Sequence, residues 1–200
     1  ADLTFGVGKG EIVGLGGLDG QGQRELMLAL FGVLRGVEGT IRIGGATYVP
    51  SSPAHARSAA WGMALVPEDR KRQGLVLGLN NRENTSLAAL PALTSLGWVK
   101  RAPERALAQR YTSRLRVKAP SLETITAGLS GGNQQKIALA KWLARSCDVL
   151  LIDEPTRGVD VGAKAEIHKL LDELACQGLA LVVISSELPE VMNLSRRILV

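Results

Sequence analysis

The sequence predicts an α/β fold with a mostly parallel central sheet, a small antiparallel β part and an inserted helical subdomain. Apolar segments of strand length, typical of strands buried on both faces, alternate with segments of helical periodicity. Residues 39–45, GTIRIGG, instead show the polar and apolar alternation of an antiparallel strand. Residues 70–129 contain no comparable strand-like run, and the helical spacing within 104–117 indicates a mostly helical insertion.

In the first third of the chain, each predicted element ends at a glycine or a proline. Residues 11–15 form a short apolar run before several glycines, which predicts a buried strand and a tight turn. The pattern over 23–32 predicts a helix that stops at its final glycine. A serine and a proline indicate the start of a helix over 52–62, and a buried strand is predicted at 63–67.

After the insertion, the same alternation of helix and strand returns. A helix is predicted over 131–145, followed by a buried strand at 148–155 that ends in two acidic residues. Residues 163–175 have one apolar face and predict the next helix. A last buried strand at 179–185 and a short helix at 187–192 complete the pattern.

The composition fits one domain over residues 1–200, in which about 70–129, continuing through the helix to 145, is the helical subdomain. The longest apolar run is too short to cross a bilayer, and no signal-peptide pattern is present, so we expect a cytoplasmic protein. Cys147 and Cys176 do not form a C-x-x-C pair, which predicts reduced thiols. The first and last residues both fall in strand-like runs, which suggests a piece of a longer polypeptide.

Positive charge is concentrated in the predicted insertion. Residues 70–118 contain eleven Lys and Arg residues and two acidic ones, Glu83 and Glu104, so this segment carries +9 and the rest of the chain −4. A solvated helical surface, an anionic membrane surface, an acidic protein partner and nucleic acid all fit this charge. Aromatic residues are not interleaved with the basic ones, which argues against stacking on single-stranded nucleic acid.

The turn after the first predicted strand has the layout of a phosphate-binding loop without its two functional side chains. Gly17, Gly20 and Gly22 fit the glycine-rich pattern G-x-x-x-x-G-K-[ST], but Gln23 replaces its lysine and Arg24 its hydroxyl residue. The spacing excludes a dinucleotide-binding G-x-G-x-x-G loop, because the third glycine is missing. A strand before the turn and a helix after it favour an anion site made of backbone N–H groups.

Two acidic residues follow the buried run LLI. Asp153 and Glu154 are predicted at the carboxyl end of a strand, where ligands bind in open α/β sheets. One carboxylate there can hold Mg²⁺ through water while the next deprotonates an attacking water. The simpler interpretation is a pair of acids that cap the following helix.

The stretch LSGGNQQK is the most specific motif in the chain. Ser130 is a favourable N-cap residue, and Gly131 and Gly132 expose unhindered N–H groups at the positive end of a helix. Such an end attracts an anion. A capped helix with a flexible start explains the serine but not the whole string.

Several motifs together resemble one known family. LSGGNQQK and LLIDEPTRGVD are similar to the signature, Walker B and D-loop motifs of ATP-binding-cassette (ABC) ATPases, and the similarity extends over residues 10–200. The stretches VPEDRKRQGLVLGLNNRENTSL and ISSELPEVM resemble the second, C-terminal cassette of fused double-cassette ATPases that drive monosaccharide import, such as ribose, galactose and xylose systems. The resemblance implies a P-loop NTPase fold and the cofactors ATP and Mg²⁺, and leaves the sugar open.

In this family two cassettes close head to tail, with ATP between the P-loop of one and the signature of the other. By resemblance, Asp153 is the Walker B residue that holds Mg²⁺ through water, and Glu154 is the catalytic glutamate. The residues implied to contact nucleotide are Gly17, Gly20, Gly22, Gln23, Arg24, Ser130, Gly131, Gly132 and Asp160.

The departures from the family pattern predict a division of labour. Glu68 stands at the Q-loop glutamine position and Ser186 at the switch histidine position, while Gln23 and Arg24 replace the P-loop side chains. We therefore expect the chain's own P-loop to bind nucleotide weakly and hydrolyse it poorly. Its signature is expected to complete the ATP site of the other cassette, so the isolated domain should be weak or inactive as an ATP hydrolase.

The resemblance also implies the partners and the location. The expected partners are the N-terminal cassette of the same chain, transmembrane permease subunits and, indirectly, a periplasmic or extracellular sugar-binding protein. The protein should lie peripherally on the cytoplasmic face of the inner membrane, with the basic insertion toward the permease. No nucleic acid partner is expected.

Two alternatives remain open at this stage. An ABC-type ATPase of DNA repair or chromosome maintenance also carries an LSGG-type signature, although the long coiled coil or zinc module that normally interrupts it is missing. A catalytically silent regulatory cassette is the other alternative, but such a subunit has no chemical need for Glu154 or a complete signature.

Overall fold

The computed structural model describes residues 3–17 and 20–200, and they form two compact units. Unit 1 comprises the described residues up to Leu65 together with Cys147–Pro155 and Leu171–Val200. Unit 2 comprises Val66–Ser146 and Thr156–Leu170, and so contains the whole of residues 70–129.

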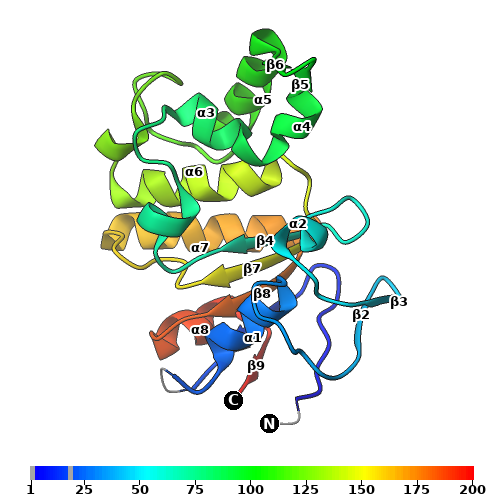
Figure 1. Cartoon of the computed structure of the whole chain (residues 1–200). Helices are drawn as coiled ribbons and strands as arrows, with labels where there is room; N and C mark the ends of the chain where they lie inside the picture. Colours follow the sequence, from blue (N-terminus) through cyan, green and yellow to red (C-terminus); the bar gives the residue numbers. More distant parts are fainter. Residues whose placement is uncertain (1–2, 18–19) are drawn as a thin grey trace. The chain divides into compact units, whose positions relative to one another are not determined.

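Unit 1 is built on a five-stranded sheet with the order β4-β7-β8-β1-β9 (Figure 1). The neighbouring pairs β7–β8, β8–β1 and β1–β9 are parallel, as the apolar runs predict. The strands are β1 (Ile12–Leu15), β4 (Met63–Val66), β7 (Val149–Asp153), β8 (Ala180–Ile184) and β9 (Arg197–Leu199).

The central strands form the core of unit 1. The side chains of Leu150, Leu151 and Ile152 are fully buried, so β7 is covered on both faces. Burying each such side chain stabilises the fold by about 1.5–3 kcal/mol. This burial places the residue that ends the strand, Asp153, at the carboxyl edge of the sheet, beside Ile184 of β8.

Helices, a hairpin and the last part of α7 (Val161–Cys176) complete the described part of unit 1. The other helices and the hairpin are α1 (Gln23–Leu30), α2 (Pro53–Ala56), α8 (Leu188–Leu194) and the antiparallel pair β2 (Ile41–Ile43) and β3 (Ala46–Tyr48). Helix α8 packs closely on β1 because Gly14 has no side chain. A Cβ atom there would lie 2.4 Å from Cγ1 of Val191 and 2.3 Å from Oγ of Ser195.

The helix predicted over 52–62 is shorter than the sequence suggests. Ser52 caps it as expected, because its Oγ accepts the N–H of His55, but α2 ends at Ala56. The next residues form a turn in which the Ser58 carbonyl accepts the N–H groups of both Trp61 and Gly62. The Trp61 indole N–H also donates to Nε2 of His55 at 2.8 Å, so the chain folds back instead of continuing as a helix.

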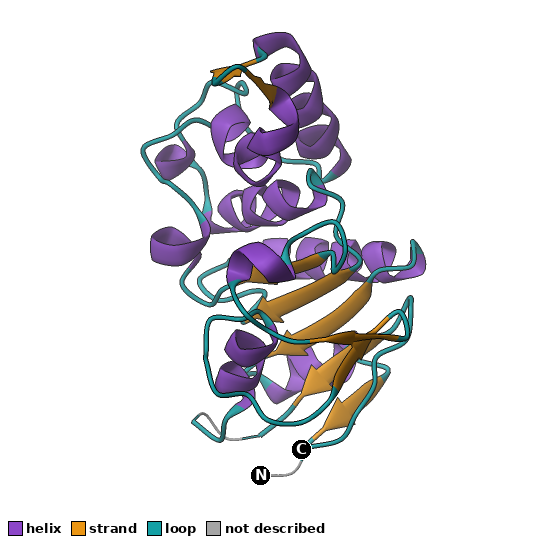
Figure 2. Cartoon of the chain, turned by 45° about the vertical axis from the view of Figure 1, so that its right-hand side comes forward, coloured by secondary structure: helices purple, strands orange, loops and turns teal. Residues whose placement is uncertain are grey.

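Unit 2 is mostly helical (Figure 2). Its elements are α3 (Asn81–Ser86), α4 (Leu90–Leu93), α5 (Arg101–Arg114), α6 (Gly131–Leu143), the hairpin β5 (Thr94–Ser95) and β6 (Trp98–Val99), and the first part of α7 (Val161–Cys176). Buried polar contacts join the helices: Glu104 of α5 accepts from Ser86 at 2.7 Å and pairs with Arg82. None of the helices in the described part of the chain has the length and hydropathy needed to cross a bilayer.

The hairpin of β5 and β6 was not predicted. Its tip exposes Leu96 and Trp98, whose exposed fractions are 97% and 81%. Leu96 also has a φ of +51°, a conformation that a leucine side chain disfavours. Because both faces of the hairpin are exposed, its sequence lacks the alternation that marks a half-buried strand.

Candidate functional site

The loop between β1 and α1 has the backbone of an anion-binding turn. Gly17, Gly20 and Gly22 all have positive φ, at 143°, 82° and 104°, which favours glycine at each position. Gly22 is the N-cap of α1, and because glycine has no side chain it cannot cap the first N–H groups of the helix. Residues 18 and 19, part of the same predicted loop, lie outside the described residues.

Two neutral amide side chains lie over this loop. A Cβ atom on Gly17 would lie 2.3 Å from Nε2 of Gln23 and 2.7 Å from Oε1 of Gln21. The Gln23 amide also donates a long hydrogen bond of 3.4 Å to the Gly16 carbonyl. The position of the usual lysine is therefore taken by a neutral group that turns back toward the loop.

Arg24 forms an ion pair with the acid at the end of β7. Its Nε lies 3.0 Å from Oδ2 of Asp153, and the two side chains are 46% and 9% exposed. Mg²⁺ prefers oxygen ligands, and a guanidinium group supplies none. The described residues also contain no cluster of three or more potential metal-binding side chains. The ion pair with Arg24 therefore disfavours Mg²⁺ at Asp153, and the predicted water-mediated magnesium site stays a prediction.

Glu154 follows in a constrained conformation. Its φ is +54°, and its N–H donates to the Ile184 carbonyl at 2.9 Å. Its Oε1 accepts the backbone N–H of Ser186 at 2.6 Å, so the predicted catalytic glutamate and switch position are in direct contact. Burial raises the pKa of Glu154, the Ser186 N–H opposes this, and the charge of Asp153 adds a smaller increase. A raised pKa suits a carboxylate that accepts a proton.

A second group of predicted residues lies at the start of α6 in unit 2. Ser130 occupies the N-cap position, but its hydroxyl makes no cap bond, contrary to the expected capping. The side-chain amide of Asn133 competes with the helix N–H groups and donates to Oγ of Ser130 at 2.9 Å. Oδ1 of Asn133 accepts the backbone N–H of Lys118 at 2.7 Å, which fixes the amide. Because the Ser130 oxygen accepts this bond, its hydroxyl hydrogen can be donated to an anion.

The two glycines of this motif allow close packing. A Cβ atom on Gly131 would lie 2.3 Å from the Gly158 carbonyl oxygen, and one on Gly132 would lie 2.7 Å from Cβ of Ala163. Asp160, predicted to contact nucleotide, has its Oδ1 bonded to the N–H of Ala163 at 2.9 Å. The carboxylate of Asp160 therefore also stabilises the first turn of α7.

The segment after β4 contains Glu68, which the sequence singled out, and Arg70, which it did not. Glu68, at the Q-loop position, forms an ion pair with Arg157. Two residues later, Arg70 is buried and donates to backbone carbonyls of the 157–158 segment. In the sequence Arg70 looks like its exposed basic neighbours, so only its contacts 87 and 88 residues away distinguish it.

The predicted site residues thus form two groups. Those in unit 1 are Gly17, Gly20, Gly22, Gln23, Arg24, Asp153, Glu154 and Ser186. Those in unit 2 are Glu68, Ser130, Gly131, Gly132 and Asp160. Within each group, the contacts described above bring the residues close together.

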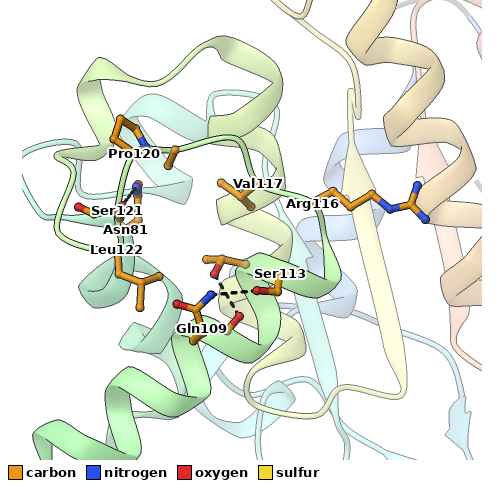
Figure 3. Close-up of a pocket in the computed structure, with 10 residues that line it drawn as sticks. Asn81, Gln109, Ser113, Arg116, Val117, Pro120, Ser121 and Leu122 are labelled. Carbon is orange, nitrogen blue, oxygen red and sulfur yellow. Dashed lines mark hydrogen bonds between the residues drawn. The ribbon is translucent and has the colours of Figure 1, made fainter.

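A cavity of about 200 Å³ in unit 2 contains none of the predicted residues (Figure 3). Its lining is mostly neutral and includes Gln109, whose amide donates to Oγ of Ser113 at 2.9 Å. The one charged residue of the lining, Arg116, extends away from the other labelled side chains in Figure 3. This lining does not suit a phosphate group.

Comparisons with known proteins agree on one family. The sequence pattern of the ABC transporter family matches residues 1–157. The chain is 48% identical over 99% of its length to the ribose import ATP-binding protein RbsA 1 of Rhizobium etli. It is 49% identical over its full length to the xylose import ATP-binding protein XylG of Geobacillus kaustophilus. It spans only 39% of the length of each of these relatives.

Solved structures agree on the fold. A nucleotide-free ATP-binding cassette of an ABC transporter superposes with a TM-score of 0.78 at 18% identity, covering 94% of this chain and 76% of that one. A dimeric ATP-binding cassette in a post-hydrolysis state with ADP and Pi gives 0.79 at 22% identity, covering 97% and 82%.

Proposed function

The chain belongs to the ABC transporter family, and we propose that it is the second, C-terminal cassette of a double-cassette ATPase that drives monosaccharide import. In this proposal its own phosphate loop is degenerate, and its signature residues complete an ATP site on the N-terminal cassette. The observation that carries the proposal is the contrast between the Arg24–Asp153 ion pair and the ordered signature around Ser130.

The chain's own loop should bind nucleotide weakly. Loss of a charged contact to phosphate costs about 1.5–3 kcal/mol, which is roughly a 10- to 150-fold loss of affinity. The positive-φ glycines still favour a backbone cradle, but the amide of Gln23 brings no positive charge. Arg24 does bring a charge, although Asp153 already neutralises it.

Hydrolysis at this site should suffer more than binding. The side chain that would carry a hydroxyl for Mg²⁺ is Arg24, which repels a cation. Glu154 has the raised pKa of a general base and accepts the backbone N–H of Ser186, but the side chain at position 186 is a hydroxyl and supplies no imidazole. We therefore assign Glu154 to a site that lacks the other side chains needed for hydrolysis.

The signature residues keep the features needed to bind an anion. Helix α6 is 13 residues long, so its first N–H groups carry the positive end of a substantial helix dipole. The Ser130 hydroxyl, oriented by Asn133, adds a directed donor. These donors suit the terminal phosphate of an ATP molecule bound to the other cassette.

The expected partners follow from the same proposal. Permease subunits, and through them a sugar-binding protein outside the membrane, would place the chain peripherally on the cytoplasmic face. The basic α5 and the hairpin with exposed Leu96 and Trp98 support a partner-binding role for unit 2. An exposed tryptophan and leucine lower the solubility of a protein, so their exposure favours a role in binding another protein.

The test uses the full-length importer ATPase reconstituted with its permease. Ser130→Ala should reduce transport-coupled ATP hydrolysis strongly, because it removes a donor to the phosphate that reacts. Gln23→Ala should change it only modestly, because Gln23 already lacks a charge. The reverse ranking would overturn the division of labour. If neither variant lost ATP hydrolysis activity, a silent regulatory cassette would be favoured.

A further inference from the structure

Arg70 is a buried cation whose contacts are backbone carbonyls. Its side chain lies at the start of the π-helical turn Arg70–Gly74, and the residue is 5% exposed. Nη1 donates to the Arg157 carbonyl at 2.5 Å and Nη2 to the Gly158 carbonyl at 3.2 Å. Burying a guanidinium group is costly for folding. The charge of the adjacent Asp69 opposes the effect of burial on the pKa of Arg70, but burial is the larger effect, so the pKa is lowered. This cost suggests that the arrangement serves another purpose.

The carbonyl that Arg70 holds is the one that packs against the signature. A Cβ atom on Gly131 would lie 2.3 Å from the Gly158 oxygen and 3.0 Å from Nη2 of Arg70. Arg70, Gly158 and Gly131 therefore meet at one point within unit 2. A shift of residues 157–158 would be felt directly at the start of α6.

A second contact joins the same two segments. Glu68, two residues before Arg70, forms an ion pair with the side chain of Arg157. Arg157 is thus held through its side chain by Glu68 and through its carbonyl by Arg70. Two sets of contacts therefore connect residues 68–70 with residues 157–158, and a displacement of one segment should displace the other.

We propose that Arg70 is a positioning residue that fixes residues 157–160 against Gly131, so that the signature keeps the geometry needed to serve the ATP of the other cassette. This inference rests on the proposed function. Arg70 fixes this segment through a fork, the two guanidinium N–H groups that hold the carbonyls of residues 157 and 158. Lysine cannot replace this fork, since one ammonium group does not reproduce two parallel N–H donors on a planar group.

The first measurement follows hydrogen exchange of this chain by mass spectrometry. Arg70→Lys should increase exchange over residues 157–160 by about 10-fold, because local opening becomes easier, and should leave α5 unchanged. Arg72→Gln is the matched control, since Arg72 is an exposed cation in the same turn. Equal protection of residues 157–160 in the Arg70→Lys variant and the parent would overturn the proposal.

The second measurement uses the full-length ATPase with its permease. Arg70→Gln and Arg70→Lys should lower kcat about 10- to 100-fold, as expected for a misplaced reacting group. The KM for ATP should change by less than about threefold, because the partner's P-loop still binds the nucleotide. A purely structural role would instead lower the folded fraction and leave the kcat of the remaining folded enzyme unchanged.

Ser130→Ala is measured in parallel to separate the two ideas. If Ser130→Ala abolishes activity and the Arg70 variants keep theirs, Arg70 is not a positioning residue and the proposed function stands. If Ser130→Ala keeps full activity, the proposed function fails whatever the Arg70 variants do. Should Arg70→Gln not fold, the kcat and exchange of Arg70→Lys decide the question.

Discussion

Residues 20–24 of unit 1 and residues 130–133 of unit 2 both present backbone N–H groups at the start of a helix, but they differ in their side chains. In the first region, Gln23 lies over the loop and Arg24 binds Asp153. In the second, Asn133 and the Lys118 backbone hold the Ser130 hydroxyl in place. Backbone shape alone therefore does not make a phosphate site, because the side chains decide whether an anion and a metal ion can bind.

The largest effect is expected from closing the space at the signature. Gly131→Ala places a Cβ atom against the Gly158 carbonyl, a backbone atom that cannot turn away. We expect the ATPase activity of the full-length protein to fall about 100-fold, as for an approximately 1 Å misplacement of a reacting group. The control is Gly128→Ala, where nothing lies within 4 Å. Near-normal activity of Gly131→Ala would show that the close packing is not needed.

The next prediction restores the degenerate loop. The double change Gln23→Lys and Arg24→Ser adds the missing charge and removes the cation from Asp153. The affinity of this chain for Mg·ATP should rise roughly 10- to 150-fold, since a charged phosphate contact is regained, as measured by calorimetry. Arg24→Ser alone should gain less. If the double variant binds no more tightly, the backbone of the loop has also lost its function.

A smaller effect is expected from the residue that orients Ser130. Asn133→Ala removes the bond to the Ser130 hydroxyl and the bond from the Lys118 N–H. Because a typical hydrogen bond contributes about 0.5–1.5 kcal/mol, full-length ATPase activity should fall about 2- to 10-fold. Gln109→Ala, which also removes an amide bonded to a hydroxyl in unit 2, should have no such effect. Equal activities of the two variants would mean that Ser130 needs no support.

The smallest effect concerns the stability of unit 1. Burial raises the pKa of Glu154, so its contribution to stability is present at acidic pH, below its ordinary pKa, and is lost as the pH rises through the raised value. Glu154→Gln should therefore raise the Tm at pH 7.5, by no more than a few degrees because the group is partly exposed. The difference should disappear near pH 4. A gain that persists unchanged at pH 4 would have another cause.

Much of the fold could be predicted from the sequence because burial leaves a direct pattern. The run from 148 to 155 is apolar because β7 is covered on both faces, and the helix over 23–32 is amphipathic. The helix over 52–62 was predicted too long, because the contact of Trp61 with His55 depends on tertiary folding. The β5–β6 hairpin was missed because it buries nothing that would leave a pattern.

The candidate site could be predicted only in part, for a similar reason. Motif spacing placed Asp153 and Glu154 at a strand end, and the structure has them there. The ion pair of Arg24 with Asp153 and the buried fork of Arg70 join residues far apart in sequence. Ser130 occupies the predicted N-cap position, but its hydroxyl makes no cap bond because it accepts the side-chain amide of Asn133, three residues later.

The exposed tip of the β5–β6 hairpin has a practical consequence for handling the isolated chain. The side chains of Leu96 and Trp98 form an exposed apolar patch, and Lys100 and Arg101 follow it in the sequence. Purified on its own, the chain should adhere to hydrophobic resins and self-associate as it is concentrated. Replacing Trp98 with serine would be the first substitution to try for a sample that stays monodisperse.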